Sequence, residues 1–193
     1  MSMHQHFMIH KPFGYLSQFI NNQNKRKNKK LLGELYCFPE GTMSIGRLDE
    51  SSEGLLLLTT DGKVSALIRS RKVEKEYYVQ LDGNITDEAI LKMCEGLEIG
   101  IRNKKYLTLP CKASRLNQLP SFEPRTKKIR DPRHGPTSWI SVTLTEGKFR
   151  QVRKMTAAVG FPTLRLVRIR IGDIFLDQLA PGAVIAVENF NLG

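Results

Sequence analysis

Residues 46–62 decide the fold and read Gly-Arg-Leu-Asp-Glu-Ser-Ser-Glu-Gly-Leu-Leu-Leu-Leu-Thr-Thr-Asp-Gly. An acidic, serine-rich loop bracketed by glycines runs directly into a continuous apolar run, Leu55 to Leu58, which is typical of a buried strand. A carboxylate on a short loop at the edge of a buried sheet is rigidly placed and poorly hydrated, which suits catalysis. The stretch therefore predicts a buried strand with an acidic loop at its entrance, which holds Asp49, Glu50 and Glu53.

The chain around this stretch is basic. Its 193 residues carry 30 Lys and Arg against 19 Asp and Glu, which gives a formal net charge of +11. This charge favours a polyanionic partner, and nucleic acid fits better than a membrane because no long apolar segment or amphipathic anchor is present. Cys37, Cys94 and Cys111 lack metal-ligand spacing, which indicates reduced thiols of a cytoplasmic protein.

Hydrophobic patterning predicts strands and helices that alternate irregularly along the chain. Strands are expected at residues 7–10, 42–46, 55–58, 76–81, 139–144 and 164–171, with a pair of hairpins over 97–113. Helices are expected at 31–36, after Asp61-Gly62 with Val64, Leu67 and Ile68 on one face, from Thr86 or Asp87 to Gly96, and from Phe149 to Val159. The irregular order favours an α+β fold with a mixed, mainly antiparallel sheet and flanking helices.

Two segments outside these elements are strongly basic. Residues 25–30 follow a polar run, and residues 114–137 hold four prolines within a long surface loop. Lys127, Lys128 and Arg130 of the second loop are candidates for contacts with nucleic-acid phosphates. Residues 25–30 are candidates for the same contacts, and both loops also fit solvated segments that aid solubility, an alternative that is nearly as good for residues 25–30.

The helix expected after Glu146-Gly147 carries a candidate partner for the carboxylate. On a helical wheel its apolar face is formed by Phe149, Val152, Met155, Thr156 and Val159. Arg153 falls at the border of that face, where an arginine can bury its stem and present its guanidinium at the edge of a groove. Periodicity alone is also satisfied by an ordinary surface arginine.

A second element, Lys75-Glu76-Tyr77-Tyr78-Val79, places two tyrosines on one strand. Neighbouring strand residues face opposite ways, so Tyr77 and Tyr78 cannot both line one cleft.

These motifs together resemble the RsuA-type pseudouridine synthases, and they follow that family's order from His10 to Gly172. The resemblance makes the aspartate of Gly-Arg-Leu-Asp, Asp49, the catalytic residue. It implies that Tyr77 stacks on uracil and that Arg153, rather than Lys154, pairs with the aspartate.

The same resemblance implies further substrate contacts. They come from Arg47 beside the aspartate and from Leu166 and Arg168 on the closing strand of the family, the run from Leu164 to Gly172.

The reaction implied is the isomerisation of uridine to pseudouridine within ribosomal RNA after the target base has left its stack. It conserves atoms and electrons, so no metal and no cofactor is expected. Asp49 acts either as a nucleophile at C1′ or as a base at C2′, and the sequence leaves both routes open. The runs Pro136 to Ile140 and Phe161 to Leu164 favour the large-subunit branch of the family, with 23S rRNA as partner.

The resemblance also implies the domain organisation. We expect residues 1–193 to form a single catalytic domain, a monomer with two lobes around a central cleft. We expect no N-terminal S4 domain of the kind that many members of the family carry.

Two other functions remain open on the residues alone. A non-catalytic RNA-binding or ribosome-assembly factor would explain the charge but not the acidic loop. A hydrolase with Asp49 and Glu53 as a carboxylate pair would explain the acids but not the basic surface.

Overall fold

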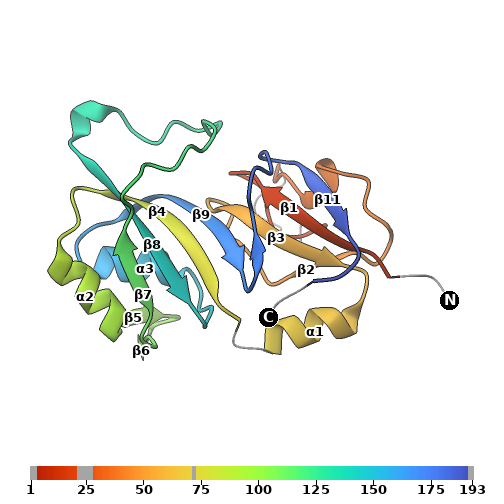
Figure 1. Cartoon of the computed structure of the whole chain (residues 1–193), viewed down its shortest axis with the longest axis horizontal. Helices are drawn as coiled ribbons and strands as arrows, with labels where there is room; N and C mark the ends of the chain where they lie inside the picture. The colour runs from red at the N-terminus through yellow and green to blue at the C-terminus, as the bar shows by residue number, and fades with distance from the viewer. Residues whose placement is uncertain (1–3, 21–27, 71–72, 191–193) are drawn as a thin grey trace.

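A computed structural model describes residues 4–20, 28–70 and 73–190. Within these ranges nine strands form one sheet, whose main path runs in the order β11-β1-β3-β9-β4-β8-β7 (Figure 1). β2 pairs with β3 and β10 pairs with β9, beside this path. The pairing of β3 with β9 is parallel and the other pairings of the sheet are antiparallel. The α+β prediction with a mixed, mainly antiparallel sheet is therefore confirmed.

The strands of this sheet are β1 (His6–Lys11), β2 (Met43–Ile45), β3 (Glu53–Thr59), β4 (Lys75–Asp82), β7 (Lys112–Arg115), β8 (Thr137–Leu144), β9 (Thr163–Ile171), β10 (Ile174–Phe175) and β11 (Val184–Val187). A separate hairpin is formed by β5 (Glu98–Ile101) and β6 (Lys104–Leu107). The helices are α1 (Gly62–Ser70), α2 (Asp87–Glu95) and α3 (Gln151–Ala158), with 3-10 turns η1 (Leu32–Glu34) and η2 (Pro132–His134). In the described part of the chain, no helix has the length and apolar character that a membrane crossing requires.

The apolar run Leu55 to Leu58 is fully buried because both faces of the strand pack against a hydrophobic cluster. Leu55 and Leu57 pack with Val167 in one cluster, and Leu56 and Leu58 pack with the first strand in another. A strand with two buried faces needs apolar residues at every position, which explains why Leu55 to Leu58 do not alternate.

The molecule has a core in each half of the sheet (Figure 1). In one half, β4 and β8 pack against α2 and α3 through a cluster that includes Met93, Ile140 and Met155. In the other half, β1 and β3 carry two clusters, one of which includes Ile68 of α1. The parallel pair β3 and β9 joins the halves.

Gly54 allows that junction to form. Its φ is +106°, and a Cβ built there would lie 2.3 Å from the carbonyl oxygen of Arg168. A side chain at this position would therefore separate β3 from β9.

Three local expectations are wrong. The last helix begins at Gln151, so Phe149 lies outside it and is 60% exposed. Leu67 of α1 is half exposed, whereas Ile68 on the same helix is buried. The second expected hairpin does not form, because β7 pairs with β8 instead of β6. In each case tertiary packing overrides a local pattern.

Candidate active site

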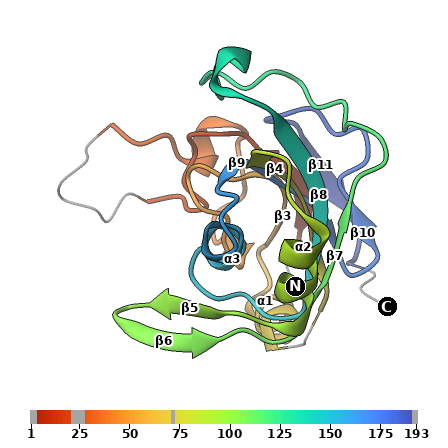
Figure 2. The same ribbon diagram turned by 90° about the vertical axis from the view of Figure 1, so that its left-hand side faces the viewer.

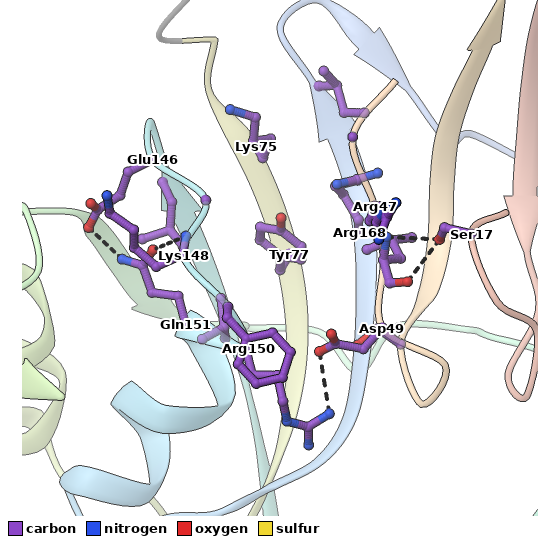
Figure 3. A pocket seen from close by; sticks show the side chains of 18 of the residues that line it. Ser17, Arg47, Asp49, Lys75, Tyr77, Glu146, Lys148, Arg150, Gln151 and Arg168 are labelled. Carbon is purple, nitrogen blue, oxygen red and sulfur yellow. Dashed lines mark hydrogen bonds and ion pairs between the residues drawn. The ribbon is translucent and has the colours of Figure 1, made fainter. Parts of the chain in front are cut away.

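A cavity of about 840 Å³ opens where the two halves of the sheet meet (Figure 3). Its walls include the loop before β3, the start of β4, the segment between β8 and α3, and β9, with further contributions from residues 16–18, α1 and Leu109. Asp49, Tyr77 and Arg150 all line it, although they are far apart in the sequence. The predicted residues Arg47, Leu166 and Arg168 line the same cavity.

The loop that carries Asp49 is held rigidly by backbone contacts. The hydroxyl of Ser17 donates to the carbonyl oxygen of Leu48 at 2.8 Å and accepts from its N–H at 2.9 Å. The N–H of Gly14 donates to the carbonyl oxygen of Glu50 at 2.8 Å, and the N–H of Ser52 donates to that of Asp49 at 3.0 Å. These bonds fix the backbone on both sides of the carboxylate.

The carboxylate of Asp49 faces an arginine that the sequence did not single out. Nη1 of Arg150 lies 3.5 Å from Oδ2 of Asp49, and both side chains are partly exposed (Figure 3). The predicted partner, Arg153, makes no such contact, so this pairing has to be corrected. The reason is that the chain turns at Lys148 to Gln151 before the helix begins, which brings Arg150 over the cavity.

The side chain of Arg153 binds the backbone of the same loop. Its Nη2 donates to the carbonyl oxygen of Ser51 at 2.8 Å, and its Nη1 donates to that of Thr163 at 3.4 Å. Burial, followed by the positive charge of Arg150, lowers the pKa of Arg153 to about 10. Lys154 points elsewhere and donates to the carbonyl oxygen of Gly100.

The two tyrosines of β4 lie on opposite faces of the sheet, as strand alternation predicts. Tyr77 lines the cavity, whereas the ring of Tyr78 packs with Phe122 at a centroid distance of 6.2 Å. Only Tyr77 is therefore placed to meet a bound base.

Leu166 and Arg168 of β9 are both buried, with exposures of 5% and 4%. Nε of Arg168 donates to the carbonyl oxygen of Leu55 at 2.8 Å, and its Nη2 has no hydrogen-bond partner among the described residues. Arg168 is thus a buried cation at the wall of the cavity, with one donor to spare. It is not a solvated charge at a sheet edge.

Glu53 is bound on the other side of β3 and does not face Asp49. Arg165 grips it with two bonds, Nη2 to Oε1 at 2.7 Å and Nε to Oε2 at 3.1 Å. Both side chains are nearly inaccessible to solvent. This geometry removes the carboxylate pair that a hydrolase would need. Arg165 was not predicted as a partner of Glu53, because the pairing of β3 with β9 is a long-range contact.

The basic loop formed by residues 114–137 does not line the cavity. Lys127 and Lys128 are exposed, and Lys128 lies 3.5 Å from Asp131. Arg130 is used within the structure: it donates to Asp82 at 2.7 Å and to the carbonyl oxygens of Gly135 and Pro136. Arg130 is thus engaged within the structure, and its contact with a phosphate stays a prediction.

The other predicted basic segment lies partly outside the described residues, which leave out 21–27. Of its remainder, Lys29 pairs with Glu50 at 2.5 Å and the ammonium of Lys30 lies over the ring of Tyr15.

Lys11 is a second residue whose place the sequence did not predict. It is fully buried, and its Nζ donates to the carbonyl oxygens of Pro12 and Tyr15 at 2.9 and 2.8 Å. Burial lowers its pKa to about 7, although the negative charges of Glu53 and Asp49 partly oppose this.

No cluster of three or more His, Cys, Asp or Glu side chains in the described ranges could hold a metal ion.

Comparison with known proteins agrees with this geometry. Residues 5–158 match the family described as RNA pseudouridylate synthase. Ribosomal large subunit pseudouridine synthase E of Xanthomonas axonopodis is 40% identical over 186 residues, which cover 95% of this chain and 94% of that protein. Ribosomal large subunit pseudouridine synthase E of Vibrio parahaemolyticus is 39% identical over 91% of this chain and 70% of that protein.

A solved structure agrees as well. A crystal structure of a pseudouridylate synthase, 28% identical, superposes with a TM-score of 0.76 over 97% of this chain and 71% of that one. The predicted relation to the large-subunit branch is confirmed by the two relatives. With the family match covering most of its length, this chain belongs to the RNA pseudouridylate synthase family.

Proposed function

We propose that this protein isomerises a uridine of ribosomal RNA, in 23S rRNA, to pseudouridine. The observation that carries the proposal is the carboxylate of Asp49, held on a fixed loop, which lines a cavity together with an aromatic ring, Tyr77, and an arginine, Arg150. The similarity to two ribosomal large subunit pseudouridine synthases supports the choice of RNA.

The reaction breaks the bond between N1 of uracil and C1′ of ribose, rotates the base, and joins C5 to C1′. Positive character develops on the sugar as N1 departs, and a fixed carboxylate stabilises it. Asp49 serves either as the nucleophile at C1′ or as the base that takes the C2′ proton. In both routes the C5 proton is lost and N1 gains one, so product and substrate are isomers.

The neighbouring side chains have separate tasks in this proposal. Arg150 orients the carboxylate of Asp49, and Arg153 holds the loop on which it sits. Tyr77 offers its ring for stacking on the flipped uracil and its hydroxyl for proton transfer. Arg168, which lines the same cavity, adds a positive charge beside the nucleotide.

The RNA has to give up a stacked uridine, which costs a few kcal/mol. Phosphate contacts offset that cost. Lys127 and Lys128 take this role because both are exposed, whereas Arg130 is held by Asp82. The protein acts as a cytoplasmic monomer whose two lobes form one catalytic domain.

The decisive experiment compares wild type with Asp49→Asn on ribosomal RNA from cells that lack the gene. We expect the variant to fold, to bind RNA and to lose at least about a thousandfold in the rate of pseudouridine formation, because the charge is needed in the transition state. Site-specific pseudouridine mapping measures this and identifies the uridine.

Asp177→Asn is the matched control. It makes the same change on an exposed aspartate outside the cavity, at a φ of +46° that asparagine tolerates well. Substantial turnover by Asp49→Asn in a clean preparation would reject the role of Asp49. Absence of product with the wild type would favour the alternative, a non-catalytic RNA-binding or ribosome-assembly factor.

A further inference from the structure

The segment between β8 and α3 contains a tight turn from Lys148 to Gln151. The N–H of Gln151 donates to the carbonyl oxygen of Lys148 at 3.1 Å, and Oε1 of Gln151 accepts from the N–H of Lys148 at 3.0 Å. Phe149 and Arg150 occupy the two central positions. Arg150 has a φ of +54°, which an L-residue other than glycine rarely adopts.

The carboxylate of Glu146 anchors this turn through hydrogen bonds. Oε1 of Glu146 accepts from Nε2 of Gln151 at 2.5 Å and from the N–H of Leu109 at 2.9 Å. Its Oε2 accepts from the hydroxyl of Tyr106 at 2.5 Å. Glu146 therefore ties the turn to the β5–β6 hairpin, which lies beside α3 (Figure 2).

The turn presents two side chains to the cavity. Arg150 reaches Asp49, while the ring of Phe149 lines the cavity and stays 60% exposed. The ammonium of Lys154, held by the carbonyl oxygen of Gly100, lies 5.2 Å from the centroid of that ring. A single exposed aromatic side chain needs no explanation by itself. This one is held by a strained and anchored turn next to the catalytic carboxylate, which calls for one.

We propose that Phe149 is a stacking platform for the nucleobase next to the flipped uridine. This inference rests on the proposed function. Because one turn carries Phe149 and Arg150, the ring is fixed relative to Asp49 and hence relative to C1′ of the bound uridine. Tyr77 serves the uracil itself, so the exposed ring at the opening of the cavity faces a neighbouring nucleotide.

The chemistry of flipping explains why such a platform is useful. A uridine that leaves its stack deprives its neighbour of a stacking surface, and a phenyl ring replaces that surface for any base. Phe149 thus contributes to RNA affinity and to the flipped state without reading sequence.

The test uses the shortest rRNA fragment that the wild type modifies, with 2-aminopurine placed in turn on the 5′ and the 3′ side of the target. Wild type should quench the fluorescence at one of the two positions. Phe149→Ala should abolish this quenching and raise KM about tenfold, with kcat changed less than about threefold. Phe149→Trp should restore both.

Phe175→Ala is the matched control, since it removes another half-exposed phenylalanine from a strand that does not line the cavity. It should leave KM and quenching unchanged. Unaltered quenching and KM in Phe149→Ala would overturn the inference, and so would a loss in kcat alone, which would place the ring on the reacting base. A wild type that forms no product would reject the proposed function instead.

Discussion

Two arginines, one turn apart, divide the support of Asp49 between them. Arg150 meets the carboxylate itself across 3.5 Å in a partly exposed position. Arg153 is largely buried and donates to the carbonyl oxygen of Ser51, two residues further along the same loop. One guanidinium therefore orients the side chain and the other orients the backbone that carries it.

Substituting each arginine by alanine should separate these tasks. Arg150→Ala should lower kcat about 10- to 100-fold, because the carboxylate loses its orienting partner, while stability changes by less than about 1 kcal/mol, as for an exposed pair. Arg153→Ala should cost about 2–3 kcal/mol of the free energy of unfolding, because buried carbonyl groups lose a charged donor. Steady-state kinetics and urea unfolding measure the two effects.

Arg150→Lys keeps the charge and serves as the control, with activity between that of wild type and Arg150→Ala. A fully stable Arg153→Ala with a large loss in kcat, beside an active Arg150→Ala, would return the pairing role to Arg153.

The parallel contact between β3 and β9 places the Asp49 loop against β9. β3 brings the end of the Asp49 loop, and β9 brings Leu166 and Arg168. The two backbones approach so closely at Gly54 that a Cβ would lie 2.3 Å from the carbonyl oxygen and 2.6 Å from the nitrogen of Arg168.

Gly54→Ala should therefore destabilise the protein by at least about 3 kcal/mol, because the methyl group meets backbone that cannot yield and φ is unfavourable. Gly62→Ala is the matched control. A Cβ at Gly62, the first residue of α1, meets no atom within 4 Å, so alanine should be neutral or slightly stabilising. Chemical denaturation of both variants is the measurement, and equal stabilities would contradict the close approach.

The same elements show which features of the fold local sequence patterns can predict. The apolar run of β3, the alternation of β4 and the Thr86 cap of α2 were predicted correctly, since each depends on neighbouring residues. Helix α3 was extended wrongly to Phe149. The apolar spacing from Phe149 onward fits a helix. The hydrogen bonds made by Gln151 and Glu146 form a turn there instead, so the helix begins two residues later, at Gln151.

At the scale of the whole molecule, one buried lysine, Lys11, links folding stability to pH. Lys11 lies where the end of β1 meets the turn that contacts the Asp49 loop, and its ammonium is satisfied by the carbonyl oxygens of Pro12 and Tyr15. Burial lowers its pKa to about 7 from the usual lysine value of 10.5. Between these values the unfolded chain holds a proton that the folded protein has lost.

The stability of the folded protein should therefore rise with pH above 7, because unfolding takes up this proton. Relative to Lys11→Met, the wild type should gain about 1.5 kcal/mol between pH 7 and 8.5. Urea unfolding of both proteins at the two pH values tests this, because ionisation of the cysteine thiols is common to both proteins and cancels in the comparison. Parallel pH profiles of the two proteins would mean that Lys11 stays charged in the folded state.

The sequence by itself determined the α+β class, the buried strand, the acidic loop that holds Asp49 and the opposite orientations of Tyr77 and Tyr78. These follow from short-range periodicity and turn chemistry, and the motif order led to the family. Only the tertiary structure decided that Arg150 reaches Asp49, that Arg165 binds Glu53 and that Lys11 is buried. Two of these contacts join residues about a hundred positions apart, and the third depends on how a turn packs. Strand pairing and a turn set them, and no local pattern encodes either.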